Sequence, residues 1–160
     1  MANQTFNPGE DRFIVSSCLA GLDTRYDGGN KLCEPVKKLV GQAIAVPFCP
    51  EQGGGLATPR PPAEITGGDG HDVLAGRARV LTREGKDVTQ EFIRGAREML
   101  RLAQAIGAGK AILKSLSPSC GHKAIYDGTF SGKIVTGDGV TSALLKESGI
   151  EVITEEELDD

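Results

Sequence analysis

The hydrophobic positions of this chain form two patterns, short unbroken runs and repeats at intervals of three and four residues. Four short apolar runs, which predict buried strands, lie at residues 12–17, 43–48, 110–115 and 150–154. Three segments with the longer spacing, which predict helices, lie at residues 32–43, 87–109 and 139–149. Strands and helices therefore alternate along most of the chain.

The helix expected over 87–109 has the strongest signals. Its apolar face consists of Phe92, Ile93, Ala96, Met99, Leu100, Ala103 and Ile106. Thr89 is suited to cap its first turn, and Gly107 and Gly109 mark its end. In the helix expected over 32–43, Pro35 fits only in the first turn, where its missing N–H group costs nothing.

Alternating strands and helices are typical of a mainly parallel sheet with helices on both faces. Residues 77–89 alternate apolar and polar positions around a glycine, which predicts one more strand running into a bend. The sequence therefore predicts a single Rossmann-like α/β domain over 12–155, with long loops at the carboxyl edge of its sheet. An N-terminal tail (1–11) and an acidic tail (156–160) flank this domain.

Composition narrows the range of partners. The chain has 160 residues and a net charge of −4, no tryptophan, and no basic cluster longer than Lys37–Lys38, so we expect no intact nucleic acid as partner. No apolar run approaches the length of a membrane span, and the first residues lack the pattern of a signal peptide, so we expect no membrane contact and a cytoplasmic location. We expect a monomer or a homodimer that binds a small molecule.

Glycine and proline gather in three polar loops, at residues 23–30, 50–70 and 115–132. Loops of this length inside a small domain are uncommon unless they are functional or disordered. The third loop contains "SLSPSCGH", which is poor material for either a strand or a helix. These loops are the expected place for a functional site.

Three of the four cysteines follow predicted strands. Cys18 comes after the first strand, Cys49 after the second, and Cys120 lies in the loop after the strand at 110–115. Because parallel strands end at one edge of a sheet, we expect these three thiols to lie close together. Cys33 belongs to the start of a predicted helix with apolar neighbours and is most simply a core residue.

The cysteines permit more than one role. In a reducing compartment they are metal ligands, reactive thiols or core residues rather than disulfides. There is no CxxC motif and no histidine pair, and His71 and His122 are the two imidazoles of the chain, so local zinc or ferredoxin signatures are absent. Three thiolates without a fourth protein ligand suit a metal centre with one open coordination position.

Polar groups near the cysteines add candidate chemistry. Glu51, two residues after Cys49, is placed to act as a general base, although a helix-capping or solvent-facing role fits equally well. Ser115, Ser117 and Ser119 supply hydroxyl groups around Cys120.

The predicted substrate contacts come from all three loops. They are Tyr26, Asp27, Gly54, Ser119 and His122. Tyr26 offers a wall for a planar ligand, whereas Asp27 can also simply pair with Arg25. Gly54, in "GGG", lets backbone N–H groups approach a ligand, but a tight turn requires glycine equally.

Several long motifs resemble the thiouracil desulfidase family. They are "CLAGLDTRYDGG" at 18–29, "PFCPEQGGGLATPRPPAE" at 47–64, "GKDVTQEFIRGA" at 85–96, "AILKSLSPSCG" at 111–121, "IYDGTFSG" at 125–132 and "GDGVTSALLKESGIEV" at 137–152. They occur in the family's order and span nearly the entire chain.

The resemblance implies a specific chemistry. It implies a [4Fe-4S] cluster held by Cys18, Cys49 and Cys120, whose free iron captures the sulfur of the substrate. The reaction implied is non-redox removal of sulfur from a thiolated pyrimidine such as 4-thiouracil, as a base or nucleoside, giving uracil and sulfide. Glu51 would activate water and Ser117 would relay a proton. The residues alone leave two alternatives, a zinc- or thiol-dependent hydrolase and a non-catalytic nucleobase-binding module.

Overall fold

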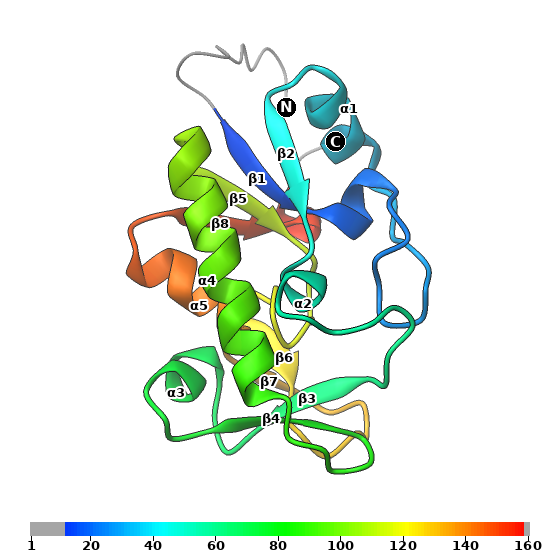
Figure 1. The fold of residues 1–160 in the computed structure, drawn as a ribbon, viewed down its shortest axis with the longest axis vertical. Coiled ribbons are helices and arrows are strands. Elements are labelled where there is room, and N and C mark those ends of the chain that lie inside the picture. The colour runs from blue at the N-terminus through cyan, green and yellow to red at the C-terminus, as the bar shows by residue number, and fades with distance from the viewer. Residues whose placement is uncertain (1–11, 159–160) are drawn as a thin grey trace.

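A four-stranded parallel sheet forms the centre of the protein in the computed structural model, which describes residues 12–158 (Figure 1). Its strands are β1 (Phe13–Ser16), β2 (Ala45–Phe48), β5 (Lys110–Leu113) and β8 (Glu151–Thr154), in the order β2-β1-β5-β8. Pro47 lies in the edge strand β2, the position where a residue without an N–H group costs least. The predicted parallel sheet is therefore confirmed.

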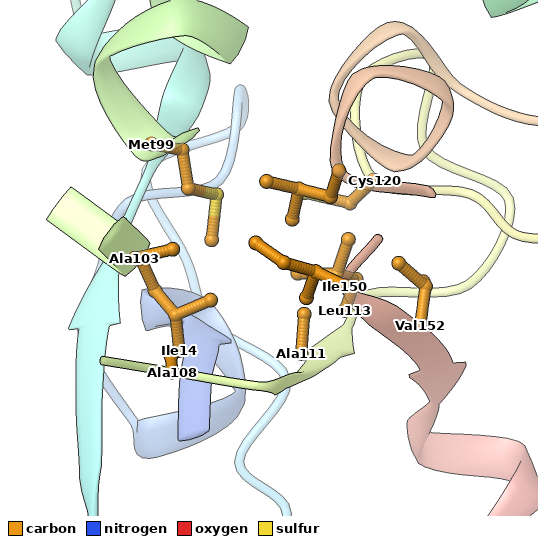
Figure 2. Packing of buried hydrophobic residues seen from close by; sticks show 10 residues of the cluster. Ile14, Met99, Ala103, Ala108, Ala111, Leu113, Cys120, Ile150 and Val152 are labelled. Atoms are coloured by element: carbon orange, nitrogen blue, oxygen red, sulfur yellow. The ribbon is translucent and has the colours of Figure 1, made fainter. Parts of the chain in front are cut away.

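Helices cover both faces of this sheet. α4 (Thr89–Ile106) and α5 (Val140–Glu147) pack on one face, where Ile14 and Leu113 point from β1 and β5 toward Met99 (Figure 2). On the other face, α1 (Glu34–Gly41) and the 3-10 turn η1 (Ser17–Ala20) pack against the strand side chains that point to that side of the sheet, such as Val15. Burial of each such side chain stabilises the fold by about 1.5–3 kcal/mol. Because successive side chains of a strand point to opposite faces, the strands hold a helical layer on each side of the sheet.

The ends of the helices test the expected signals. Pro35 lies in the first turn of α1, and Gly107 closes α4 with a φ of 71°, as predicted. The prediction that Thr89 caps α4 is wrong, because the cap position is Val88. The Thr89 hydroxyl accepts a hydrogen bond from the Val80 N–H group instead, and so connects α4 to β4 (Arg79–Thr82).

A second layer of short antiparallel strands lies below the main sheet in Figure 1. β3 (Ala63–Thr66) pairs with β4 (Arg79–Thr82), and β6 (Ala124–Tyr126) pairs with β7 (Ile134–Thr136). The strand expected within 77–89 is β4.

Two of the three expected loops contain regular structure. Residues 50–70 hold α2 (Pro50–Gly53), β3 and the first residue of α3 (Gly70–Leu74), and residues 115–132 hold β6. The interpretation of these two stretches as entirely irregular is therefore wrong.

The acidic end of the chain is partly ordered. Glu155–Glu157 form the 3-10 turn η2, in which the Glu155 carboxylate accepts hydrogen bonds from the Ser115 N–H group (2.7 Å) and from Lys114 (2.9 Å). The expected tail at 156–160 is therefore anchored at its start, and the tail at 1–11 lies outside the described residues. Across 12–158, no helix is long and apolar enough to span a bilayer.

Candidate active site

A cavity of about 510 Å³ opens at the carboxyl edge of the main sheet. Cys18 reaches it from η1 after β1, Cys49 from the start of α2 after β2, and Cys120 from the loop after β5. All three thiols are free, and all three line this cavity. Cys33 is the cap residue of α1 and packs against the hydrophobic core between α1 and the sheet. It is not among the described residues that line the cavity.

Burial disfavours the ionised form of these three thiols. It raises the pKa of Cys120 to about 12, although hydrogen bonds from Ser16 and Ser119 work in the other direction. It also raises the pKa of Cys18 to about 11, against the attraction of Arg25, and it raises the pKa of Cys49. Because the negative charge of each thiolate also disfavours ionisation of another, the three sulfurs act as one electrostatic group.

Hydrogen-bond donors surround the sulfur atoms. Ser16 donates to Cys120 Sγ at 3.2 Å, and its Oγ accepts from the Lys114 N–H group at 2.9 Å, which joins the ends of β1 and β5. Arg60 donates to Cys49 Sγ at 3.9 Å. Such donors are typical of the surroundings of iron–sulfur clusters, where hydrogen bonds to sulfur tune the centre.

The spacing of the three sulfurs distinguishes between metal centres. Thiolates on one tetrahedral zinc ion, at about 2.3 Å each, lie about 3.8 Å apart. Among the described residues, the three cysteines do not form a group with all ligand atoms within 4.8 Å of one another. At least one pair of these sulfurs is therefore farther apart than in a single tetrahedral zinc site, and three thiolates without a fourth protein ligand suit a cluster of several irons with one iron free of protein ligands.

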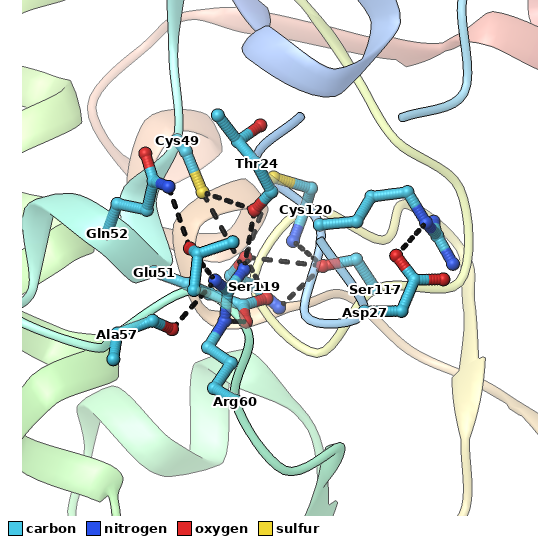
Figure 3. Close-up of polar contacts among 12 residues, drawn as sticks. Thr24, Asp27, Cys49, Glu51, Gln52, Ala57, Arg60, Ser117, Ser119 and Cys120 are labelled. Atoms are coloured by element: carbon cyan, nitrogen blue, oxygen red, sulfur yellow. Dashed lines mark hydrogen bonds and ion pairs between the residues drawn. The ribbon is translucent and has the colours of Figure 1, made fainter. Parts of the chain in front are cut away.

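Glu51 lies on α2, next to the cysteines. Its Oε1 accepts a hydrogen bond from Arg60 Nε at 2.9 Å in an ion pair that is largely buried (Figure 3). α2 is held by backbone contact with α4, because an added Cβ would lie 1.9 Å from the Glu91 carbonyl at Gly54 and 1.7 Å from the Pro50 carbonyl at Gly95. This close contact fixes the backbone that carries the carboxylate.

A chain of hydroxyl groups connects Ser117 to Glu51. Ser117 Oγ accepts from the N–H groups of Ser119 and Cys120 (3.1 and 3.0 Å), and it lies 3.2 Å from Ser119 Oγ. Because these two N–H groups occupy the lone pairs of Ser117, its proton is directed to Ser119. The single proton of Ser119 Oγ has two acceptors in reach, Glu51 Oε2 at 3.3 Å and Cys120 Sγ at 3.5 Å.

The structure divides the predicted substrate contacts. Tyr26 and Ser119 line the cavity, whereas Asp27, Gly54 and His122 are not among the described residues that do. Asp27 instead accepts from the Gly29 N–H group in an exposed turn, 3.7 Å from Arg25.

The other two residues outside the cavity have structural contacts of their own. Gly54 permits the contact of α2 with α4. His122 points away from the cavity, and its Nδ1 lies 3.0 Å from Glu157 on η2.

Sequence reasoning missed other residues of the cavity. Arg60 and Lys114 lie on the side of the cysteines, and both belong to motifs that carried the family resemblance. The opposite wall is formed by Arg83 after β4, Tyr126 on β6 and Phe130 in the β6–β7 turn. The guanidinium carbon of Arg83 lies 5.6 Å from the centroid of the Phe130 ring. Arg83 lies in the strand and bend expected over 77–89, and Tyr126 and Phe130 lie in the expected loop at 115–132, within the family motif at 125–132, but none of the three was named as a contact.

The fold and the cavity define the class of protein, a single-domain α/β protein with a cysteine-lined cavity at the carboxyl edge of its sheet. The sequence profile of the 2-thiouracil desulfurase family matches residues 13–157, and the chain belongs to this family.

The chain is also similar to two individual proteins, of which the second supports the assignment. The uncharacterized protein YbbK of Bacillus subtilis (strain 168) is 53% identical over 147 residues, covering 92% of this chain and 97% of YbbK. Among solved structures, the [4Fe-4S]-dependent thiouracil desulfidase TudS is similar, with a TM-score of 0.83, 44% identity and 93% of each chain covered. The predicted family resemblance is thereby confirmed.

Proposed function

We propose that this protein hydrolyses the carbon–sulfur bond of a thiolated pyrimidine, releasing the oxo base and sulfide. One water molecule supplies the new oxygen, and the sulfur leaves as hydrogen sulfide, so no electrons are transferred. The observation that carries this proposal is the arrangement of Cys18, Cys49 and Cys120 around one cavity beside the carboxylate of Glu51. Membership of the 2-thiouracil desulfurase family supports it.

Cys18, Cys49 and Cys120 would hold a [4Fe-4S] cluster, the cofactor named for TudS. When bound, the cluster supplies a soft Lewis-acidic iron with an open position, which prefers sulfur to oxygen and polarises the carbon–sulfur bond.

Glu51 is the general base of the proposed reaction. Arg60 holds its Oε1, while Oε2 lies at the end of the hydroxyl chain through Ser119. Oε2 takes a proton from the attacking water, and the serines carry a proton between Glu51 and Ser117, where the ring or the leaving sulfur receives it. The burial of Cys120 and Ser119 keeps bulk water from competing for the proton between Ser119 and Glu51.

The remainder of the cavity is suited to a flat polar ring. A volume of about 510 Å³ falls in the range of small-molecule sites and admits a base or a nucleoside. Tyr26, Tyr126 and Phe130 provide aromatic surfaces on which a pyrimidine can stack. The cytoplasmic location and the monomeric or dimeric state stay predictions.

The experiment that tests the proposal is purification without oxygen, followed by iron and acid-labile sulfide analysis. Sulfide release from 2-thiouracil, 4-thiouracil and their nucleosides is then measured, with uracil as the control ligand. We expect a brown protein with about four irons per chain and sulfide release from at least one thiolated compound. A colourless zinc protein without thiobase turnover would instead identify a zinc hydrolase, and binding without turnover would identify a nucleobase-binding module.

A further inference from the structure

The guanidinium group of Arg60 donates hydrogen bonds in all of its directions. It has five N–H bonds. Nε donates to Glu51 Oε1 (2.9 Å), Nη1 to Thr58 Oγ1 (2.7 Å) and the Ala57 carbonyl (3.2 Å), and Nη2 to the Thr24 carbonyl (2.8 Å) and Cys49 Sγ (3.9 Å). Each N–H bond therefore has its own acceptor (Figure 3).

These five acceptors belong to three parts of the site. Glu51 and Cys49 carry the proposed chemistry, Thr24 belongs to the loop at 23–30, and Ala57 and Thr58 lie in the segment of Arg60 itself. The loop is also bound through the backbone, because the Arg60 N–H group donates to the Tyr26 carbonyl at 2.8 Å. A single side chain therefore connects the general base, one cysteine and the loop that bears Tyr26.

Burial makes this connection rigid. The side chain of Arg60 is 6% exposed, and that of Glu51 is 15% exposed. A buried guanidinium requires an opposite charge, and the Glu51 carboxylate supplies it at 2.9 Å. Because Nε holds Oε1, the carboxylate plane cannot rotate freely, and Oε2 stays directed at Ser119.

We propose that Arg60 is a positioning residue, which fixes the Glu51 carboxylate and the loop at 23–30 relative to Cys49 in the orientation the reaction needs. This inference rests on the proposed function. Lysine cannot replace Arg60, because an ammonium group has three donors and no planar fork, so it cannot bind Glu51, Thr24 and Cys49 in these directions.

The test compares Arg60→Lys with the matched control Arg94→Lys. Arg94 also contacts α2, but through one hydrogen bond to the Gly54 carbonyl (3.2 Å) and without lining the cavity. We expect Arg60→Lys to lower kcat about 10–100-fold, the usual effect of losing a group that orients a ligand or base, with KM within about threefold and unchanged iron content. We expect Arg94→Lys to leave kcat within about twofold.

Two further measurements separate positioning from general stability. In Arg60→Ala, added guanidinium should restore kcat saturably, whereas sodium chloride at equal ionic strength should not. In a Glu51→Gln background, Arg60→Lys should cause little additional loss, because both changes disable the same group. The proposal would be overturned if the loss of kcat in the double variant equalled the product of the two single losses. An unchanged kcat in Arg60→Lys would overturn it as well.

A measurement on cofactor-free protein is independent of turnover. We expect faster amide hydrogen exchange at residues 23–30 in Arg60→Lys than in the wild type or Arg94→Lys, because the loop loses its bond from Nη2. If the wild type released no sulfide from any thiolated base, the proposed function would fail, and the exchange result alone would decide for or against Arg60. Unchanged exchange at this loop would count against the inference.

Discussion

Two regions of this protein bring together ionisable side chains from distant parts of the chain, and they differ in how the charges of these side chains are paired. One is the cavity with its three cysteines. The other is a histidine cluster, defined by Asp69, His71, Asp138, Lys146 and Glu147, which joins α3 to α5. In the cluster, His71 lies 2.7 Å from Glu147 and 2.9 Å from Asp138, and Lys146 also donates to Asp138 at 2.9 Å.

The charges of the histidine cluster are paired within the protein. Burial opposes a charged imidazole, but hydrogen bonds to Glu147 and Asp138 outweigh it and raise the pKa of His71. In the cavity, burial raises the pKa of Cys18 and Cys120, and at Cys18 it does so against the attraction of Arg25 and Lys114. A cluster that satisfies its own charges stabilises the fold, whereas a group of buried thiols favours a bound cation as partner.

The largest expected effect belongs to the cavity cysteines. Cys18→Ala, Cys49→Ala and Cys120→Ala should each abolish the visible absorbance, the bound iron and the release of sulfide, because each change removes one of the three thiolates proposed to hold the cluster. Cys33→Ala is the matched control, since this residue lies outside the cavity, and it should keep all three properties. Loss of iron in Cys33→Ala would contradict the assigned ligand set.

The next effect concerns the base. Glu51→Gln should lower kcat by about 10²–10⁴-fold, because the amide keeps an acceptor for Arg60 but cannot take a proton. Iron content and absorbance should stay at the wild-type level. Turnover at the wild-type rate would remove Glu51 from the mechanism.

The contact between α2 and α4 should show its importance in stability. Gly54→Ala should lower the free energy of unfolding by about 1–3 kcal/mol, because the new methyl group would collide with the Glu91 carbonyl. Urea denaturation measures this change. The matched control is Gly41→Ala, where nothing lies within 4 Å of the new Cβ and stability should not fall.

The smallest effect should come from the histidine cluster, which faces Asp69, Asp138, Glu147 and Lys146 and lies outside the cavity. Because the pKa of His71 is raised in the folded state, its contribution is fully present below the unfolded pKa of about 6.5 and is lost as pH rises through the folded value. His71→Gln should therefore cost up to about 1 kcal/mol near pH 5.5, since solvent screens this partly exposed group, and less near pH 8.5.

Urea titrations at both pH values test this difference, and kcat should not change. A cost that is independent of pH would show that the charge of His71 does not stabilise the fold.

The sequence was sufficient for the main sheet and for the convergence of the cysteines, and it was insufficient for the small strands. Apolar runs identify β1, β5 and β8 because both faces of these strands are buried. β6 and β7 have three residues each and β7 has no buried position, so they carry no period that could be recognised.

The misplaced residues show a related limit. Gly54 was expected near a ligand, but a glycine in a sequence does not reveal whether a substrate or a helix approaches its backbone. Arg60 could not be recognised because two of its five acceptors are backbone carbonyls, which have no sequence signature. His122 is two residues from Cys120, yet it faces η2, because the chain reverses direction around Gly121 and Lys123, which has a φ of 69°.

The two walls of the cavity have separate architectural origins, and this has a consequence for engineering. The sulfur-bearing wall is built on the parallel sheet, whereas Arg83, Tyr126 and Phe130 lie on or directly beside the short antiparallel strand pairs. A mutant library restricted to these three positions would therefore change the selectivity for modified bases while the frame for cofactor assembly stays intact. Residues that would contact the base and residues that would hold the cofactor therefore belong to separate parts of the fold and can be varied independently.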